Sequence, residues 1–447
     1  MSLLPHYKAT LRLGMPIAVG QVGVILLGFI DTMMVGRYAT DALAAASFVN
    51  NVFTLVTFLL MGYSYGLTPM VSACCGRKEY VQAGAILKNA LAANALFLLL
   101  VGGVMSILYF FLDRMGQPVE LLGLIRPYYL VILFSIPFVM LFNVLRQFTD
   151  GTTDTMAGMY PLLAGNFLNI LGNWLLIYGI GPFPEMGLLG AGVSTLFSRI
   201  FMVVALCAMV MFTKRYAAFR TGFRLARVSV GELQKVHANS YPISVQMGFE
   251  NGAFTMSAVM AGWLGSIELA SYQVMVTVGT LGFLFYYSFG AGMSIRVAHF
   301  VGLDDWRQVG MAERAGRNVL LALAVVSSLI IWTFSDQLIG FFTTDSQVLC
   351  LSLSLVGPLL LYQLADAMQI CYANALRGTS KVKPMMWVAF VSYLLVNIPL
   401  GYVLGFVVGW GIHGIFYAFS AGLLCAAILF YRYFSRVVQK SENEDFV

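Results

Sequence analysis

The chain has 447 residues, of which 60% are hydrophobic and only 10% are charged, and its mean hydropathy is +0.83. This composition excludes a soluble globular protein, because soluble domains carry roughly a quarter of their residues as charged ones. The net charge of +6 does not require a nucleic-acid partner, since membrane topology accounts for it.

Apolar stretches of about 20 residues, the length that crosses a hydrocarbon core, recur along nearly the whole chain. Alternation with a period of two is absent, which excludes a transmembrane β-barrel. No stretch between these segments is long enough for a soluble domain. The sequence therefore predicts an all-α integral membrane protein with twelve transmembrane helices at 13–36, 45–70, 87–112, 121–145, 156–180, 187–213, 238–264, 269–295, 315–335, 346–374, 384–408 and 411–435.

The second half of the chain repeats the first. An offset of 226 residues aligns the pairs Pro16/Pro242, Gly36/Gly262, Gly66/Gly292 and Gly84/Gly310. Because six helices are an even number, both halves insert with the same orientation, as parallel repeats do. We predict an N-terminal six-helix lobe at 1–213, a basic linker at 214–237, and a C-terminal six-helix lobe with a short tail at 238–447.

Basic residues set the predicted orientation. Of the 26 Lys and Arg residues, only Arg37, Arg114 and Arg126 fall on the side opposite the N-terminus, and Arg199 lies within a span. Loops rich in Lys and Arg stay in the cytoplasm. We therefore expect both termini to be cytoplasmic, in a multi-pass protein of the cytoplasmic (inner) membrane.

Three carboxylates lie in the middle of apolar spans: Asp31, Glu250 and Asp366. An ionisable group at the centre of a membrane helix costs about 2.5–3.5 kcal/mol on insertion scales. Such residues usually mark an ion or substrate pathway, so these three are the candidate functional residues.

Two of the acids belong to the predicted C-terminal lobe. Glu250 shares a helix face with Gln246, and Asp366 shares one with Tyr362. Two like charges in a medium of low dielectric constant favour a shared proton or a bound cation such as Na⁺. The alternative is a protonated, hydrogen-bonded pair that only fixes helix packing.

Asp31 is the acid of the N-terminal lobe. Its candidate companions are Asn169 and Asn173, one turn apart on the fifth predicted helix, and Thr195 on the sixth. Their oxygens suit Na⁺ or a proton relay, although asparagines also join transmembrane helices without binding an ion. Arg199 lies within a span, so its charge needs a partner there, either Asp31 or a backbone carbonyl. Alternatively, its side chain extends to the membrane surface.

The duplication does not extend to these acids. The repeat positions pair Asp31 with Ser257, Glu250 with Val24 and Asp366 with Ser135. No acid has an acidic counterpart, so we expect the two lobes to have different roles.

Five segments of the chain are informative together: FIDTMMVG, GLTPMVSACCG, GFENGAF, SIRVAHFVG and LYQLADAMQICYANALRG. They resemble the multidrug and toxic compound extrusion (MATE) transporters, in their NorM-like branch, and the similarity runs from about Leu11 to Tyr433. The resemblance implies an antiporter, driven by Na⁺ or H⁺, that exports amphipathic and often cationic organic compounds. It also implies a cation site at Glu250 and Asp366, for which Na⁺ is one candidate ion, with Tyr362 beside them.

The resemblance further implies that Asp31 is the acid of the first lobe, with Asn169, Asn173 and Thr195 as its neighbours. No cofactor is expected beyond the coupling ion. The expected partners are small organic substrates and membrane lipids, with no nucleic acid, and we expect the chain to act as a monomer.

Two other functions compete with this interpretation. A flippase for a lipid-linked substrate would line its cleft with several basic residues to hold phosphates, whereas Arg199 is the only suitable one. A membrane-embedded enzyme is disfavoured because the spans contain no HExxH or GxSxG motif.

Overall fold

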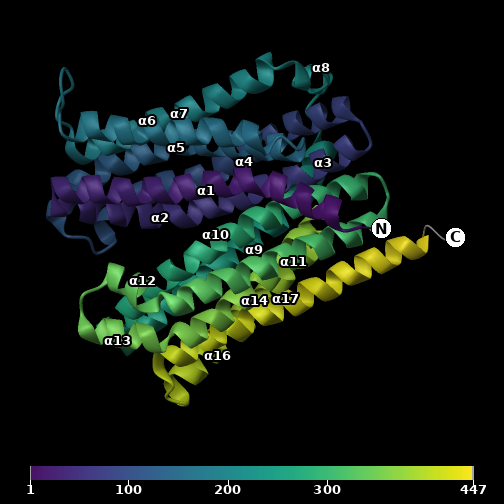
Figure 1. Ribbon diagram of the computed structural model, residues 1–447. Helices are drawn as coiled ribbons and strands as arrows, with labels where there is room; N and C mark the ends of the chain where they lie inside the picture. Colours follow the sequence, from purple (N-terminus) through teal and green to yellow (C-terminus); the bar gives the residue numbers. More distant parts are fainter. Residues whose placement is uncertain (1, 445–447) are drawn as a thin grey trace. The chain divides into compact units, whose positions relative to one another are not determined.

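The structure is a computed structural model that describes residues 2–444, and within them every regular element is a helix. The helices form two compact units (Figure 1). Unit 1 comprises Met1–Ala18 and Val245–Val447, and unit 2 comprises Val19–Ser244.

Unit 2 contains the helices of the first half of the chain. They are α1 (Leu4–Tyr38, from Val19), α2 (Thr40–Tyr65), α3 (Leu67–Gly76), α4 (Tyr80–Tyr109), η1 (Leu112–Arg114), α5 (Val119–Gly151), α6 (Thr155–Ile177), α7 (Gly187–Phe212), η2 (Lys214–Tyr216), α8 (Ala217–Leu225) and the start of α9 (Val230–Leu264).

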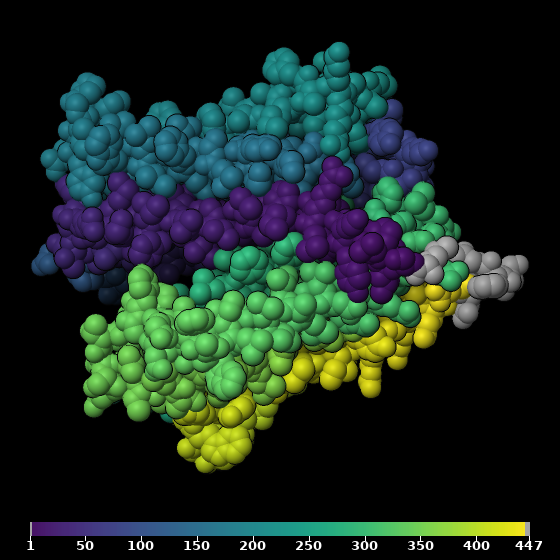
Figure 2. All heavy atoms as spheres, in the orientation of Figure 1, coloured from purple at the N-terminus to yellow at the C-terminus, as the bar shows by residue number. Residues whose placement is uncertain are grey.

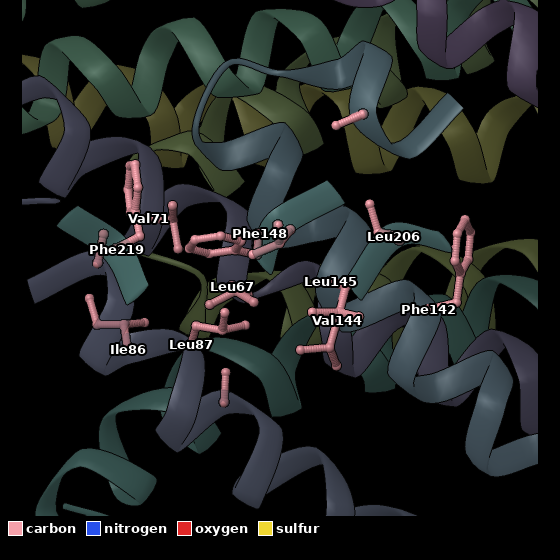
Figure 3. Close-up of a cluster of buried hydrophobic side chains, with 14 of the residues drawn as sticks. Leu67, Val71, Ile86, Leu87, Phe142, Val144, Leu145, Phe148, Leu206 and Phe219 are labelled. Carbon is pink, nitrogen blue, oxygen red and sulfur yellow. The ribbon is translucent and has the colours of Figure 1, made fainter. Parts of the chain in front are cut away.

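One hydrophobic core of unit 2 gathers side chains from helices α2 to α9. Figure 3 shows Phe219 of α8 close to Val71 of α3, Leu87 of α4 and Phe148 of α5. The rings of Phe148 and Phe219 meet edge to face, with centroids 5.5 Å apart. This contact fastens the short helix α8 to the transmembrane helices beside it.

Unit 1 contains the helices of the second half. They are the rest of α9, α10 (Ser266–Gly302), α11 (Trp306–Thr333), α12 (Ser335–Phe342), α13 (Ser346–Ser354), α14 (Val356–Gly378), α15 (Lys383–Ala389), η3 (Phe390–Asn397), α16 (Ile398–Tyr402), η4 (Val403–Val407) and α17 (Gly411–Glu444). In Figure 1, α17 runs beside α14, against which it packs closely.

All twelve predicted spans correspond to helices. In residues 2–444, nine segments are long and apolar enough to cross a membrane, and the pair α13 and α14, bent by 50° at Leu355, makes a tenth. The other two are α6, which carries Asn169 and Asn173, and α9, which carries Glu250.

The first segment of each half packs with the helices of the other half. Residues 4–18 of α1 belong to unit 1, and residues 230–244 of α9 belong to unit 2. The N-terminal residues, dark purple in Figure 2, adjoin the green helices of unit 1. The two crossing points, Ala18/Val19 and Ser244/Val245, differ by the repeat offset, so both halves share this arrangement.

The predicted linker at 214–237 is largely helical. It contains η2, α8 and the first two turns of α9. Tyr216 donates to Asp154 Oδ2 at 2.9 Å, and Arg215 lies 3.3 Å from the same oxygen. Burial raises the pKa of Tyr216, so its hydroxyl keeps the proton that it donates.

The chain passes from one unit to the other within α1 and within α9. The lobe boundaries at 213 and 238 remain sequence-based predictions.

Candidate functional site

Glu250 and Asp366 lie on neighbouring helices of unit 1, α9 and α14. The Asp366 side chain is buried at 2% exposure, and Glu250 is half-buried. The two carboxylates are close enough to interact electrostatically. The predicted pair is therefore brought together by the fold, in a low-dielectric setting where two bare negative charges are unfavourable.

Several buried polar atoms around this pair have no hydrogen-bond partner among residues 2–444. Gln246 Nε2 donates to Glu250 Oε2 at 2.7 Å, but Gln246 Oε1 is unpaired. Asp366 Oδ2 and Gln369 Oε1 are also unpaired. Each buried group without a partner costs about 1–3 kcal/mol. Unpaired oxygens of this kind are hard ligands, so the donor set fits Na⁺ or a proton.

Tyr286 and Ser327 extend the site, and sequence reasoning missed both. Tyr286 of α10 donates to Gln363 Oε1, and Ser327 of α11 donates to the same oxygen at 3.0 Å. Gln363 lies one turn from Asp366 on α14, so the network holds the polar face of that helix. A tyrosine within an apolar stretch gives no sign in the sequence of which helix it will meet.

Tyr362 is buried at 8% exposure beside the acids. Its ring packs against Phe254 and Phe419, with centroids 6.4 and 5.6 Å away. These contacts hold the ring against α9 and α17. Tyr362 is therefore where the sequence predicted it, and aromatic packing from two other helices fixes its position.

The segment between α15 and α16 adds two further polar groups. Residues Phe390–Asn397 form the π-helix η3, in which Tyr393 is fully buried. Tyr393 interacts electrostatically with Glu250 and Asp366. Among the described residues, neither the Tyr393 hydroxyl nor the two amide atoms of Asn397, at the end of η3, have a hydrogen-bond partner. π-Helical turns within longer helices often occur at functional sites.

Asp31 and the three residues predicted around it meet in unit 2. Asn173 Nδ2 donates to Asp31 Oδ1 at 2.5 Å. When the Asn169 amide is turned with its nitrogen toward Asp31, the distance to Oδ1 is 2.8 Å, and its oxygen accepts from Thr195 Oγ1 at 3.1 Å. Helices α1, α6 and α7 thus contribute to one hydrogen-bonded cluster.

Arg199 binds a residue that sequence reasoning had not proposed as its partner. Its Nη1 donates to Ser135 Oγ on α5. Within residues 2–444 no ion pair of 4.0 Å or less joins Arg199 to Asp31, although the two charges interact electrostatically. Ser135 is the repeat counterpart of Asp366, so a serine bound by a guanidinium stands where unit 1 has its buried acid.

Neither cluster is a conventional metal centre. In residues 2–444 no three His, Cys, Asp or Glu side chains are grouped as metal ligands. A cation at Glu250 and Asp366 would therefore need amide and hydroxyl oxygens as well, which suits a weakly held monovalent ion more than a divalent one.

Comparison with known families identifies the chain. The MatE family model matches residues 16–175 and 242–403, one match in each half. The chain belongs to the MatE family. Similar proteins include the multidrug resistance protein NorM of Photobacterium profundum, 29% identical over 436 residues, which are 94% of this chain and 93% of that protein. NorM of Vibrio cholerae is 28% identical, with coverages of 94% and 93%.

Solved MATE structures share the fold. One, described as the outward-facing conformation of a multidrug resistance MATE family transporter, gives a TM-score of 0.88 at 18% identity and covers 98% of this chain and 97% of that one. Another, MATE in the bent conformation, also gives 0.88 at 18% identity and covers 100% of both chains. The predicted all-α fold of twelve helices in two lobes is thereby confirmed, as is the family resemblance.

Proposed function

We propose that this MatE family protein is an antiporter that exports amphipathic, often cationic organic compounds, driven by an inward gradient of Na⁺ or H⁺. The observation that carries the proposal is the pair of half-buried Glu250 and buried Asp366, around which several polar atoms have no hydrogen-bond partner in residues 2–444. Relatives named multidrug resistance protein NorM support the class of substrate.

In this proposal the residues of unit 1 hold the coupling ion. The carboxylates of Glu250 and Asp366 receive the cation or proton, and Gln246 fixes the orientation of Glu250. Binding of the ion neutralises the two carboxylates. This changes the free energy of the conformation that binds the ion relative to the other conformation of the transporter, so ion binding and substrate release become linked. Asp31 and its amide partners form a second polar site with a separate role.

We further propose that the protein acts as a monomer in the cytoplasmic membrane of a bacterium, with both termini in the cytoplasm. The distribution of Lys and Arg supports this orientation. A cysteine introduced at residue 2 tests this orientation. Its labelling by a membrane-impermeant reagent is compared in intact and opened cells.

Reconstituted vesicles test the transport mechanism. A fluorescent organic cation is loaded into the vesicles, and a Na⁺ gradient and a pH gradient are imposed separately. We expect one of the two ion gradients to drive the dye against the concentration gradient of the dye. Glu250→Gln and Asp366→Asn should each abolish driven movement, because the neutral side chain no longer binds a cation or releases a proton. Movement in response to neither gradient would refute antiport.

The control is Asp336→Asn, which removes an exposed acid of unit 1 in the first turn of α12. It should leave transport unchanged. Insertion of every variant is checked by its yield and elution volume in detergent. Normal driven transport by both Glu250→Gln and Asp366→Asn would contradict the assignment of the pair.

A further inference from the structure

Unit 1 contains a polar cavity that the transport site does not use. It measures about 1020 Å³ and lies between α11 and the C-terminal part of α17, with Leu3 also at its wall. Arg307, Arg314 and Arg317 of α11 line it. The cavity is therefore at the same end of unit 1 as the N-terminus.

The three arginines form one stripe along α11. Their spacing of seven and three residues places them on the same helix face, over about 15 Å at 1.5 Å per residue. Arg307 and Arg314 are exposed. Two acids line the same cavity, Glu442 of α17 and Glu313 of α11. With three arginines and two acids, the lining carries one net positive charge, which attracts an anion.

Arg317 is held in place by two neighbours. Its Nη1 lies 3.4 Å from Glu313 Oε1 and donates to the Tyr372 hydroxyl at 3.4 Å. Glu313 is only 5% exposed and also lines the cavity. A guanidinium has five N–H donors, so Arg317 can make these contacts and still donate to an anion in the cavity.

The corresponding place in unit 2 is apolar and covered. The repeat offset pairs Glu313 with Leu87 and Arg317 with Leu91, both of which line an apolar pocket of about 280 Å³ under α8. A Cβ atom on Gly84 of α4 would lie 1.9 Å from the Phe219 carbonyl oxygen of α8. In unit 1 a Cβ atom on the paired Gly310 would have no atom of residues 2–444 within 4 Å, so no described helix lies against that face of α11.

We propose that this cavity, lined by Arg307, Arg314 and Arg317, binds the phosphate headgroup of an anionic phospholipid. The arginines lie in the N-terminal half of α11, a helix long and apolar enough to cross a membrane, and we expect lipid headgroups near the end of such a helix. The wall also includes the apolar side chains Met311, Phe434 and Val438, beside which an acyl chain can lie. Basic pockets between transmembrane helices suit lipid phosphates in this way.

Native mass spectrometry of the full-length protein in detergent tests the proposal. Delipidated protein is titrated with phosphatidylglycerol and, separately, with phosphatidylethanolamine. We expect phosphatidylglycerol to bind the wild type more tightly. Arg307→Gln and Arg314→Gln should each weaken it about fivefold, the contribution of one basic residue near a lipid phosphate. Both side chains are exposed, so neither variant disturbs the packing.

Arg436→Gln is the matched control, because Arg436 is an arginine of α17 that does not line the cavity. It should bind phosphatidylglycerol as the wild type does. Inorganic phosphate and glycerol phosphate are added as competitors that lack acyl chains. Failure of millimolar competitor to displace the lipid supports the proposal.

Three results would overturn it. The first is wild-type affinity for phosphatidylglycerol in the Arg307→Gln, Arg314→Gln double variant. The second is equal affinity for the two lipids. The third is displacement of the lipid by free phosphate at comparable concentration, which would make the cavity a site for soluble anions.

Discussion

At the scale of single residues, the candidate site depends on side chains whose importance only their neighbours reveal. Asp31, Glu250 and Asp366 were identifiable in the sequence because a charge inside an apolar span is costly wherever it points. Tyr286 was not, since a tyrosine in such a span is unremarkable until its hydroxyl meets Gln363. The acids and some of their neighbours, such as Asn173 and Gln246, are predictable from the sequence, whereas Tyr286 is not.

Tyr286→Phe tests that shell. Loss of the hydroxyl leaves Gln363 Oε1 with Ser327 as its donor and loosens the polar face of α14 next to Asp366. We expect the coupling-ion concentration for half-maximal efflux to rise severalfold while the maximal rate stays unchanged, because Tyr286 positions the site and does not bind the ion itself.

The matched control for this variant is Tyr402→Phe, which removes a hydroxyl from an exposed tyrosine of α16. Its ion dependence should equal that of the wild type. A fall in maximal rate for Tyr286→Phe, with an unchanged ion dependence, would show that the hydroxyl does not position the ion site.

The partner of Arg199 could not be chosen from the sequence. A charged side chain within a span requires a partner, but the sequence left several candidates open. The structure supplies Ser135, a neutral residue at the repeat position of Asp366. The choice depended on which helix α7 faces, and no spacing along the chain encodes that.

At the scale of elements, the two halves use the same helices with different coverings. Gly84 of α4 is required because the backbone of α8 lies against it, and Gly222 of α8 is equally close to the carbonyl of Val81. Glycine permits such an approach because it has no Cβ atom. Gly310 of α11 keeps the glycine without the contact.

This difference predicts opposite effects for the same substitution. Gly84→Ala forces α8 away from α4 and should destabilise the protein by about 1–3 kcal/mol, the usual cost of overpacking. Gly310→Ala should be neutral or stabilising by up to about 1 kcal/mol, because alanine favours a helix over glycine. Thermal unfolding in detergent measures both.

Trypsin provides a second readout for the same pair. Release of α8 would expose Arg220, which now donates to the Val210 and Thr213 carbonyl oxygens. Cleavage in this region should accelerate in Gly84→Ala alone. Equal stability and equal cleavage of the two variants would contradict the packing described for α8.

At the scale of the whole molecule, the duplication includes an exchange of helix ends. Gly292 of α10 lies against the backbone of Thr10 and Gly14 in α1, and Gly66 lies against that of Ser240 in α9. Gly66 pairs with Gly292, and Gly14 with Ser240, under one offset. Each half therefore binds the first segment of the other by the same contact.

Substitution at either contact should be costly. A Cβ on Gly66 would lie 2.8 Å from Ser240 Cα, and one on Gly292 would lie 2.9 Å from the Gly14 nitrogen. We expect Gly66→Ala and Gly292→Ala each to lower the free energy of unfolding by about 1–3 kcal/mol, and the thermal unfolding midpoint with it. Gly357→Ala, at a helical glycine with nothing within 4 Å, is the control. A midpoint equal to the control's in both variants would disprove this role.

The sequence by itself determined the membrane class, the number and order of the helices, the duplication and the three acids. These follow from hydropathy, periodicity and the cost of buried charge, which are properties of the chain at each position. The tertiary structure decided the partner of Arg199, the network around Gln363, the exchange of helix ends and the uncovered arginines of α11. Those depend on which helix faces meet, and residues far apart in the chain become neighbours only when the helices pack.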